Sequence, residues 1–91
     1  MAVQVRLPSA LRGLANSKKT VDLEGATVDE VLARLVVLHP QLRAAIYDER
    51  LKRRRSIHVF VDGQDVRMLS DGQTPVSSGQ LVELISAMSG G

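Results

Sequence analysis

Apolar and polar residues alternate in two short stretches near the N-terminus. The alternation covers residues 3–7 and again residues 20–24. A period of two predicts half-buried β-strands, and Pro8 and Gly25 end the first and the second strand. Residues 9–16 are predicted as a turn or loop. The two strands are therefore expected to pair as a hairpin.

The hydrophobic period then changes to that of a helix. Thr27 and Glu30 have the spacing of a capping box, in which the Thr27 hydroxyl accepts from the Glu30 amide and the Glu30 carboxylate reaches back to the Thr27 amide. Pro40 ends the helix near Leu38. A short helical turn is expected over residues 41–47. The apolar positions that follow helical spacing are Val28, Val31, Leu32, Leu35, Val36 and Leu38.

The second half of the chain predicts three further strands joined by loops. The expected strands are residues 57–61, 65–67 and 81–86. The expected loops and turns are 48–55, Asp62-Gly63, 70–75 and Ser78-Gly79. The order of hairpin, helix, strand, short strand and strand is typical of the β-grasp. This predicts an α+β fold, with one mixed sheet of four to five strands packed on one main helix. The domain is expected over residues 1–86, with a flexible tail over residues 87–91.

Composition narrows the possible chemistry. The 91 residues include no cysteine and two isolated histidines, so no disulfide, thiolate catalyst or metal site is expected. There is no Gly-rich phosphate loop, and a domain of this size has little room for a deep cavity. We therefore expect no catalytic residues and no cofactor bound by this chain. No apolar run approaches the length of a membrane span, and the N-terminus lacks the apolar region of a signal peptide. We expect a cytoplasmic protein without membrane contact.

One basic strip stands out against the net charge of +2. It comprises residues 52–55, preceded by Arg50. A solvated loop is the favoured interpretation, and steering toward an acidic or ATP-binding partner is the second. Binding of nucleic acid is the least favoured, because the strip is isolated and no aromatic residues alternate with it.

The chain ends in Ser89-Gly90-Gly91. Glycine has no Cβ, so a glycine tail can enter a narrow cleft in conformations that other residues avoid. An activated glycine also cannot racemise, because it has no stereocentre. These properties suit a carboxylate that is presented to the active site of another enzyme.

Strand parity predicts a surface for such a partner. If Val59 faces the helix, His58 and Phe60 face outward; if Val82 and Leu84 face inward, the residues on either side of them face outward. The resulting partner-docking candidates beside the tail are His58, Phe60, Leu81 and Ile85. An exposed apolar patch on a small domain often marks a partner site.

Four stretches resemble the ubiquitin-like sulfur-carrier proteins of the ThiS/MoaD family, and among them the CysO-type carriers most. They are VRLPSALR at 5–12, IHVFVDGQDVR at 57–67, SGQLVELI at 78–85 and AMSGG at 87–91. One departure is Gln80, where the family usually has Asp. Together these stretches span nearly the whole chain.

The resemblance implies a carrier that is a substrate of partner enzymes. An ATP- and Mg-dependent, E1-like adenylyltransferase would activate Gly91, with Gly90 and Ser89 threading the partner's channel. A sulfurtransferase or persulfide donor would then leave a C-terminal thiocarboxylate, and a biosynthetic enzyme for cysteine or another sulfur-containing metabolite would accept the sulfide. Two alternatives stay open, namely the small subunit of molybdopterin synthase and a modifier that forms isopeptide bonds with lysines.

Overall fold

The computed structural model describes residues 2–86, and the predicted tail lies outside this range. Within residues 2–86 the chain forms five strands, three α-helices and four short 3₁₀ turns (η). The strands are β1 (Val3–Arg6), β2 (Thr20–Leu23), β3 (Ile57–Val61), β4 (Gln64–Asp65) and β5 (Leu81–Ser86). The helices are α1 (Ser9–Arg12), α2 (Val28–Leu38) and α3 (Arg43–Ile46). The 3₁₀ turns are η1 (Gly13–Ala15), η2 (Pro40–Leu42), η3 (Val66–Met68) and η4 (Asp71–Gln73).

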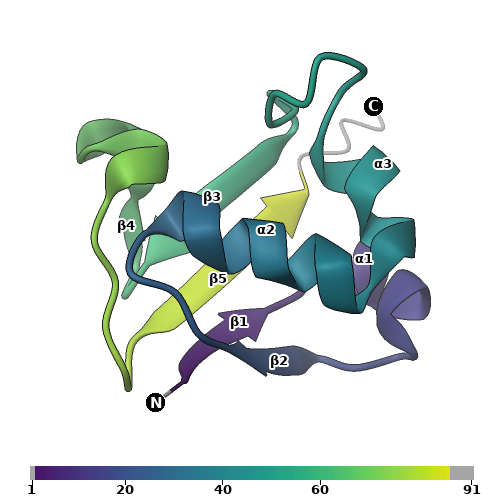
Figure 1. Cartoon of the computed structure of the whole chain (residues 1–91), viewed down its shortest axis with the longest axis horizontal. Helices are drawn as coiled ribbons and strands as arrows, with labels where there is room; N and C mark the ends of the chain where they lie inside the picture. The colour runs from purple at the N-terminus through teal and green to yellow at the C-terminus, as the bar shows by residue number, and fades with distance from the viewer. Residues whose placement is uncertain (1, 87–91) are drawn as a thin grey trace.

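The strands form one mixed sheet in the order β2-β1-β5-β3-β4. β1 and β2 pair as an antiparallel hairpin, and β5 lies parallel to β1 and antiparallel to β3. The last strand of the chain therefore occupies the centre of the sheet, between the first and the third (Figure 1). The predicted β-grasp arrangement is confirmed.

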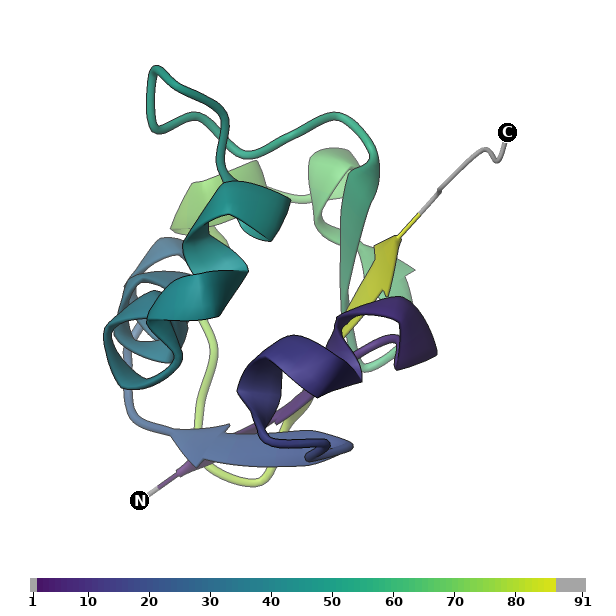
Figure 2. The same ribbon diagram turned by 90° about the vertical axis from the view of Figure 1, so that its right-hand side faces the viewer.

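Helix α2 crosses one face of this sheet, and α3 lies on the same side (Figure 2). Every second residue of β1, β2 and β3 is buried, as the alternation of the sequence predicts. Within α2 the four fully buried residues recur at helical spacing, so one stripe of the helix meets one face of the sheet. The largest fully buried side chains are Leu7, Leu32, Leu35, Leu42, Ile46 and Leu84.

The N-terminus of α2 is capped by side chains and anchored to a distant loop. The Thr27 hydroxyl accepts a hydrogen bond of 3.3 Å from the Glu30 amide, as predicted. The Glu30 carboxylate, however, accepts from the Ala26 amide at 3.0 Å and not from Thr27. The carboxylate thus closes the turn one residue earlier than in a standard capping box. The amide of Val28 donates to the carbonyl of Thr74 at 3.0 Å.

Two segments differ from the sequence prediction. The predicted loop 9–16 is helical over α1 and η1, because Leu11 and Ala15 are buried against the core. The predicted strand 65–67 stops after Asp65. Its carboxylate accepts from the Arg67 amide at 2.9 Å, and this bond caps η3 in place of further strand pairing. The predicted loop 70–75 contains η4.

The turn between β3 and β4 has the geometry that its sequence predicts. Asp62 has φ 48° and Gly63 has φ 88°, and positive φ at both central residues is the requirement of a type I′ hairpin turn. The Asp62 carboxylate also accepts hydrogen bonds from the Leu81 amide at 3.0 Å and from the Gln80 side chain at 3.1 Å. The turn is thereby tied to the start of β5.

Candidate functional site

The four predicted docking residues share the sheet face that points away from α2, and we call them the outer patch: His58, Phe60, Leu81 and Ile85. His58 lies directly opposite Ile85 in the β3–β5 ladder, and Phe60 lies opposite Glu83. Leu81 and Ile85 are therefore the two diagonal neighbours of Phe60, about 7–8 Å away between Cα atoms. Ile85 is 41% exposed, and the other three residues are half-buried.

The outer patch is not continuous apolar surface. Glu83 lies between Leu81 and Ile85 on β5 and faces Phe60 across the ladder. Its carboxylate lies 3.9 Å from the Arg6 guanidinium on β1. The Arg6 side chain is exposed and that of Glu83 is partly exposed, so this ion pair contributes little to stability. Glu83 is not among the predicted docking residues, although the parity of β5 already places it on the outer face. The structure thus shows apolar groups arranged around a carboxylate.

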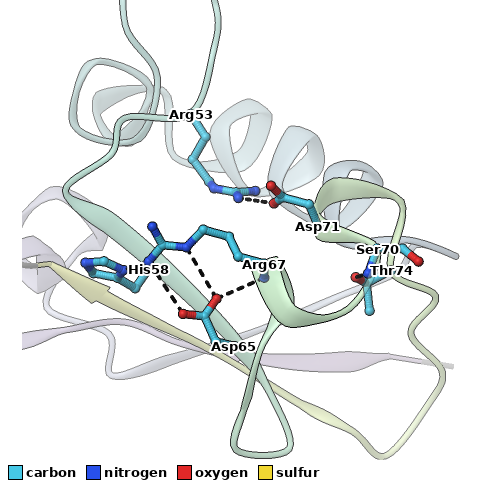
Figure 3. Close-up of polar contacts among 7 residues, drawn as sticks. All are labelled: Arg53, His58, Asp65, Arg67, Ser70, Asp71 and Thr74. Atoms are coloured by element: carbon cyan, nitrogen blue, oxygen red, sulfur yellow. Dashed lines mark hydrogen bonds and ion pairs between the residues drawn. The ribbon is translucent and has the colours of Figure 1, made fainter.

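A polar cluster adjoins the outer patch at the β4 edge (Figure 3). The Arg67 guanidinium lies 3.5 Å from the Asp65 carboxylate and contacts Nδ1 of His58. Because arginine can only donate, Nδ1 of His58 is the acceptor in this contact. The hydrogen bond from the Arg67 amide, assisted by its guanidinium, holds the pKa of Asp65 below its usual value. The sequence indicates only turn and surface-pairing roles for Asp65 and Arg67, because the contact of Arg67 with His58 depends on the fold of η3.

The end of β5 marks where the chain leaves the sheet. Ser86, the last residue of β5, pairs with Ile57, the first residue of β3. The outer-patch pair of His58 and Ile85 is the next rung of the same ladder. The predicted reactive residues Ser89, Gly90 and Gly91 lie outside the described residues. The docking candidates at this end of the sheet therefore lie close to the point from which residues 87–91 continue.

Two members of the basic strip have structural roles. The Arg53 guanidinium pairs with the Asp71 carboxylate of η4 (Figure 3), and Nε of Arg54 donates to the Ala44 carbonyl at 2.8 Å. Arg50, Lys52 and Arg55 form no side-chain hydrogen bond or ion pair within residues 2–86. The strip therefore combines two anchoring arginines with three cations directed to solvent.

Within the same range, no three His, Asp or Glu side chains gather closely enough to hold a metal ion. The part of the chain that the structure describes also contains no helix with the length and hydrophobicity needed to cross a bilayer.

Comparison with known proteins identifies the family. The model of the ThiS family matches residues 5–91. The chain belongs to the ThiS family. This ThiS-family chain is 27% identical to the sulfur carrier protein CysO of Mycobacterium tuberculosis over 93 residues, which cover 100% of both chains.

Solved structures agree with this assignment. A chain of the BexX/CysO complex from Amycolatopsis orientalis has a TM-score of 0.88 and 32% identity, covering 99% of this chain and 100% of that one. The small archaeal modifier protein 1 (SAMP1) of Methanosarcina acetivorans has a TM-score of 0.86 and 27% identity, covering 99% and 96%. The ThiS-family chain is a ubiquitin-like sulfur carrier of the CysO type, and the predicted resemblance is confirmed. Proteins of this type are small carriers rather than catalysts.

Proposed function

We propose that Gly91 carries the sulfur. An E1-like adenylyltransferase couples the Gly91 carboxylate to AMP, using ATP and Mg²⁺ that the partner binds, and releases pyrophosphate. Sulfur from a sulfurtransferase or persulfide donor then displaces AMP and leaves a thiocarboxylate; with a persulfide, a thiol must also cleave the S–S bond. The thiocarboxylate delivers sulfide to an enzyme that makes cysteine or another sulfur-containing metabolite. The observation that carries this proposal is the match to the ThiS family, which extends through Gly90 and Gly91.

The chemistry explains the division of labour. A carboxylate is a poor acyl donor, so the carrier has to offer only an acyl carbon and a docking surface, while the partners supply the catalysis. Five residues beyond Ser86 span at most about 18 Å at ~3.3–3.6 Å each. That reach lets Gly91 enter a partner's active site while the domain docks outside. The two terminal glycines add no side chain to the part that enters the cleft.

We further propose that the outer patch docks the partners. His58 and Ile85 lie one rung from the end of β5, so a partner that covers this end of the outer patch also lies beside the start of the tail. The arrangement of Phe60 opposite Glu83 favours a partner surface that combines an apolar contact with a cation. The relative from Amycolatopsis orientalis was crystallised in a complex with BexX, which shows that a CysO protein of this size binds another protein.

Intact-mass spectrometry of the protein from its native host tests the proposal. A gain of about 16 Da at the C-terminus, where sulfur replaces oxygen, is the expected signature. Deleting Gly91, or adding one residue after it, should abolish this gain and leave the fold intact. Gly13→Ala is a matched control, because an added Cβ there meets nothing within 4 Å. A truncated protein that still supports product formation would refute the assignment of Gly91.

A second function is favoured by one observation, the likeness to SAMP1, which is named as a modifier. The same activated Gly91 could be transferred to a lysine amine as an isopeptide. This function predicts conjugates of higher mass that survive reducing agents. Purification as a stable assembly with a larger subunit would instead indicate the arrangement of molybdopterin synthase. Thiocarboxylate without conjugates or a permanent partner supports the free carrier.

A further inference from the structure

A hollow of about 750 Å³ lies on the helix side of the molecule, between α2, the loop 48–55 and η4. We call it the helix-side hollow. Its wall combines aliphatic side chains of α2 with the ring of Tyr47 and the cations Arg43 and Lys52. Its volume falls in the range of about 300–1,000 Å³ that is typical of binding pockets. It lies on the opposite side of the sheet from the outer patch.

The charged groups around the hollow leave a positive excess. Asp71 is paired with Arg53, and Asp29 lies in the first turn of α2, where the helix N-terminus favours a negative charge. Arg43 and Lys52 form no side-chain hydrogen bond or ion pair within residues 2–86. The lining thus carries three cations against two carboxylates. A ligand that enters the hollow meets Arg43 and Lys52, neither of which is held in a direct ion pair by the described residues, although the Asp48 carboxylate interacts with the charge of Lys52.

Leu51 stands at the mouth of the hollow in a disfavoured conformation. Its φ is 62°, in the left-handed region that a Cβ atom makes unfavourable. Its side chain is 59% exposed, so core packing does not compensate for the backbone strain. The Asp48 carboxylate accepts from the amides of Arg50 at 2.8 Å and Lys52 at 3.0 Å, and these bonds hold the turn. An exposed leucine in a strained turn is an unusual arrangement that local packing leaves unexplained.

Charge along the chain points to the kind of partner. The loop 48–55 contains five cations and two carboxylates, a net charge of +3, whereas the whole chain has +2. The remaining residues together therefore carry −1. A positive loop on an otherwise nearly neutral domain attracts an acidic surface, and its exposed leucine provides an apolar contact within that charged surface.

We propose that the helix-side hollow and Leu51 form a second docking surface, and that its occupant is an acidic, apolar-containing segment of a partner protein. Carboxylates of the segment pair with Arg43 and Lys52. An apolar side chain of the segment packs against Leu51 and Tyr47. Because the outer patch lies on the other face of the sheet, a partner held here leaves the outer patch open to a second protein.

Binding of a blocked peptide, Glu-Leu-Glu-Glu-Leu-Glu, to the full-length ¹⁵N-labelled chain tests this proposal by NMR. We expect shifts centred on the amides of Tyr47, Leu51 and Lys52, and an affinity that falls as salt is added. Lys52→Glu should weaken binding at least about fivefold, as reversal of an interfacial charge does. Arg34→Glu is the matched control, because Arg34 is exposed on α2 outside the hollow.

A second pair of variants separates binding from folding. Leu51→Gly suits the positive φ, so the melting temperature should not fall, whereas peptide affinity should drop several-fold. Leu38→Ala removes another exposed leucine, 56% exposed on α2, and should leave affinity unchanged. Three results would overturn the proposal: no shifts around the hollow, equal affinity of the Leu51→Gly variant, or equally tight binding of a single-stranded oligonucleotide. The last would assign the surface to nucleic acid.

Discussion

The hydrogen bonds of Asp62 determine how firmly the β3–β4 turn holds the start of β5. The carboxylate accepts from the Leu81 amide at 3.0 Å and from the Gln80 side chain at 3.1 Å, and the residue has φ 48°. In Asp62→Ala both bonds are lost, at about 0.5–1 kcal/mol each for an exposed site. Alanine also tolerates the left-handed region less well than aspartate, which adds about 1 kcal/mol. We expect a total loss of about 2–3 kcal/mol.

Urea denaturation followed by circular dichroism measures this loss, with the slope m unchanged. For a domain of this size the melting temperature should fall by roughly 4–8 °C for each kcal/mol. Asp62→Gly removes the same hydrogen bonds without the strain of a Cβ, and Asp62→Asn keeps an acceptor and tolerates positive φ. Stability is expected to decrease in the order wild type, Asp62→Asn, Asp62→Gly and Asp62→Ala. If Asp62→Ala is as stable as the wild type, the two hydrogen bonds contribute nothing and the reasoning is wrong.

Three further predictions concern the outer patch and the titrating groups. Phe60→Asp should weaken partner binding in a binding assay with a modest change in stability, because Phe60 is only half-buried. Thr20→Asp, on the same sheet face, is the control. Loss of the fold in Phe60→Asp would show that Phe60 belongs to the core. The pKa of Tyr47 is raised, first by burial and then by Asp29, so stability should decline as the pH rises above the usual value of 10.0. An ultraviolet titration of this single tyrosine should give a midpoint above 10.0, and a midpoint at or below it would contradict the burial. The pKa of Asp65 is lowered by the Arg67 amide, so its contribution to stability is present above pH 3.8 and is lost as the pH falls through the lowered pKa. In urea titrations, Asp65→Asn should reduce the loss of stability at acid pH. An unchanged dependence of stability on pH would contradict the role of Asp65.

Hydrophobic periodicity was sufficient to predict the main elements of this fold. The strands at 57–61 and 81–86 and the helix that ends at Leu38 were predicted with the bounds that the structure has. Each of these elements buries one regular face, so its apolar residues recur along the sequence with the period of a strand or a helix. The inward and outward parity of β3 and β5 was predicted for the same reason, and with it the placement of the outer patch.

The misplaced elements lack such a period. α1 spans only four residues, and burial of Leu11 against the rest of the core stabilises it. η3 depends on one side-chain cap from Asp65, which competes with strand pairing. The left-handed turn at Leu51 depends on the Asp48 carboxylate. These features depend on single contacts, and a pattern of apolar positions does not encode them.

The sequence by itself determined the main β-grasp elements, the outward parity of the outer patch and the motifs, Gly90-Gly91 among them, that carry the resemblance to the sulfur carriers. Only the tertiary structure decided which side chains meet. The register of β3 on β5 places Glu83 opposite Phe60, and the fold of the chain brings Arg67 to His58 and Arg53 to Asp71 across 9 and 18 residues. The physical reason is that local burial repeats with the period of each element, whereas contacts between elements depend on register and loop conformation, which the whole packed chain sets at once.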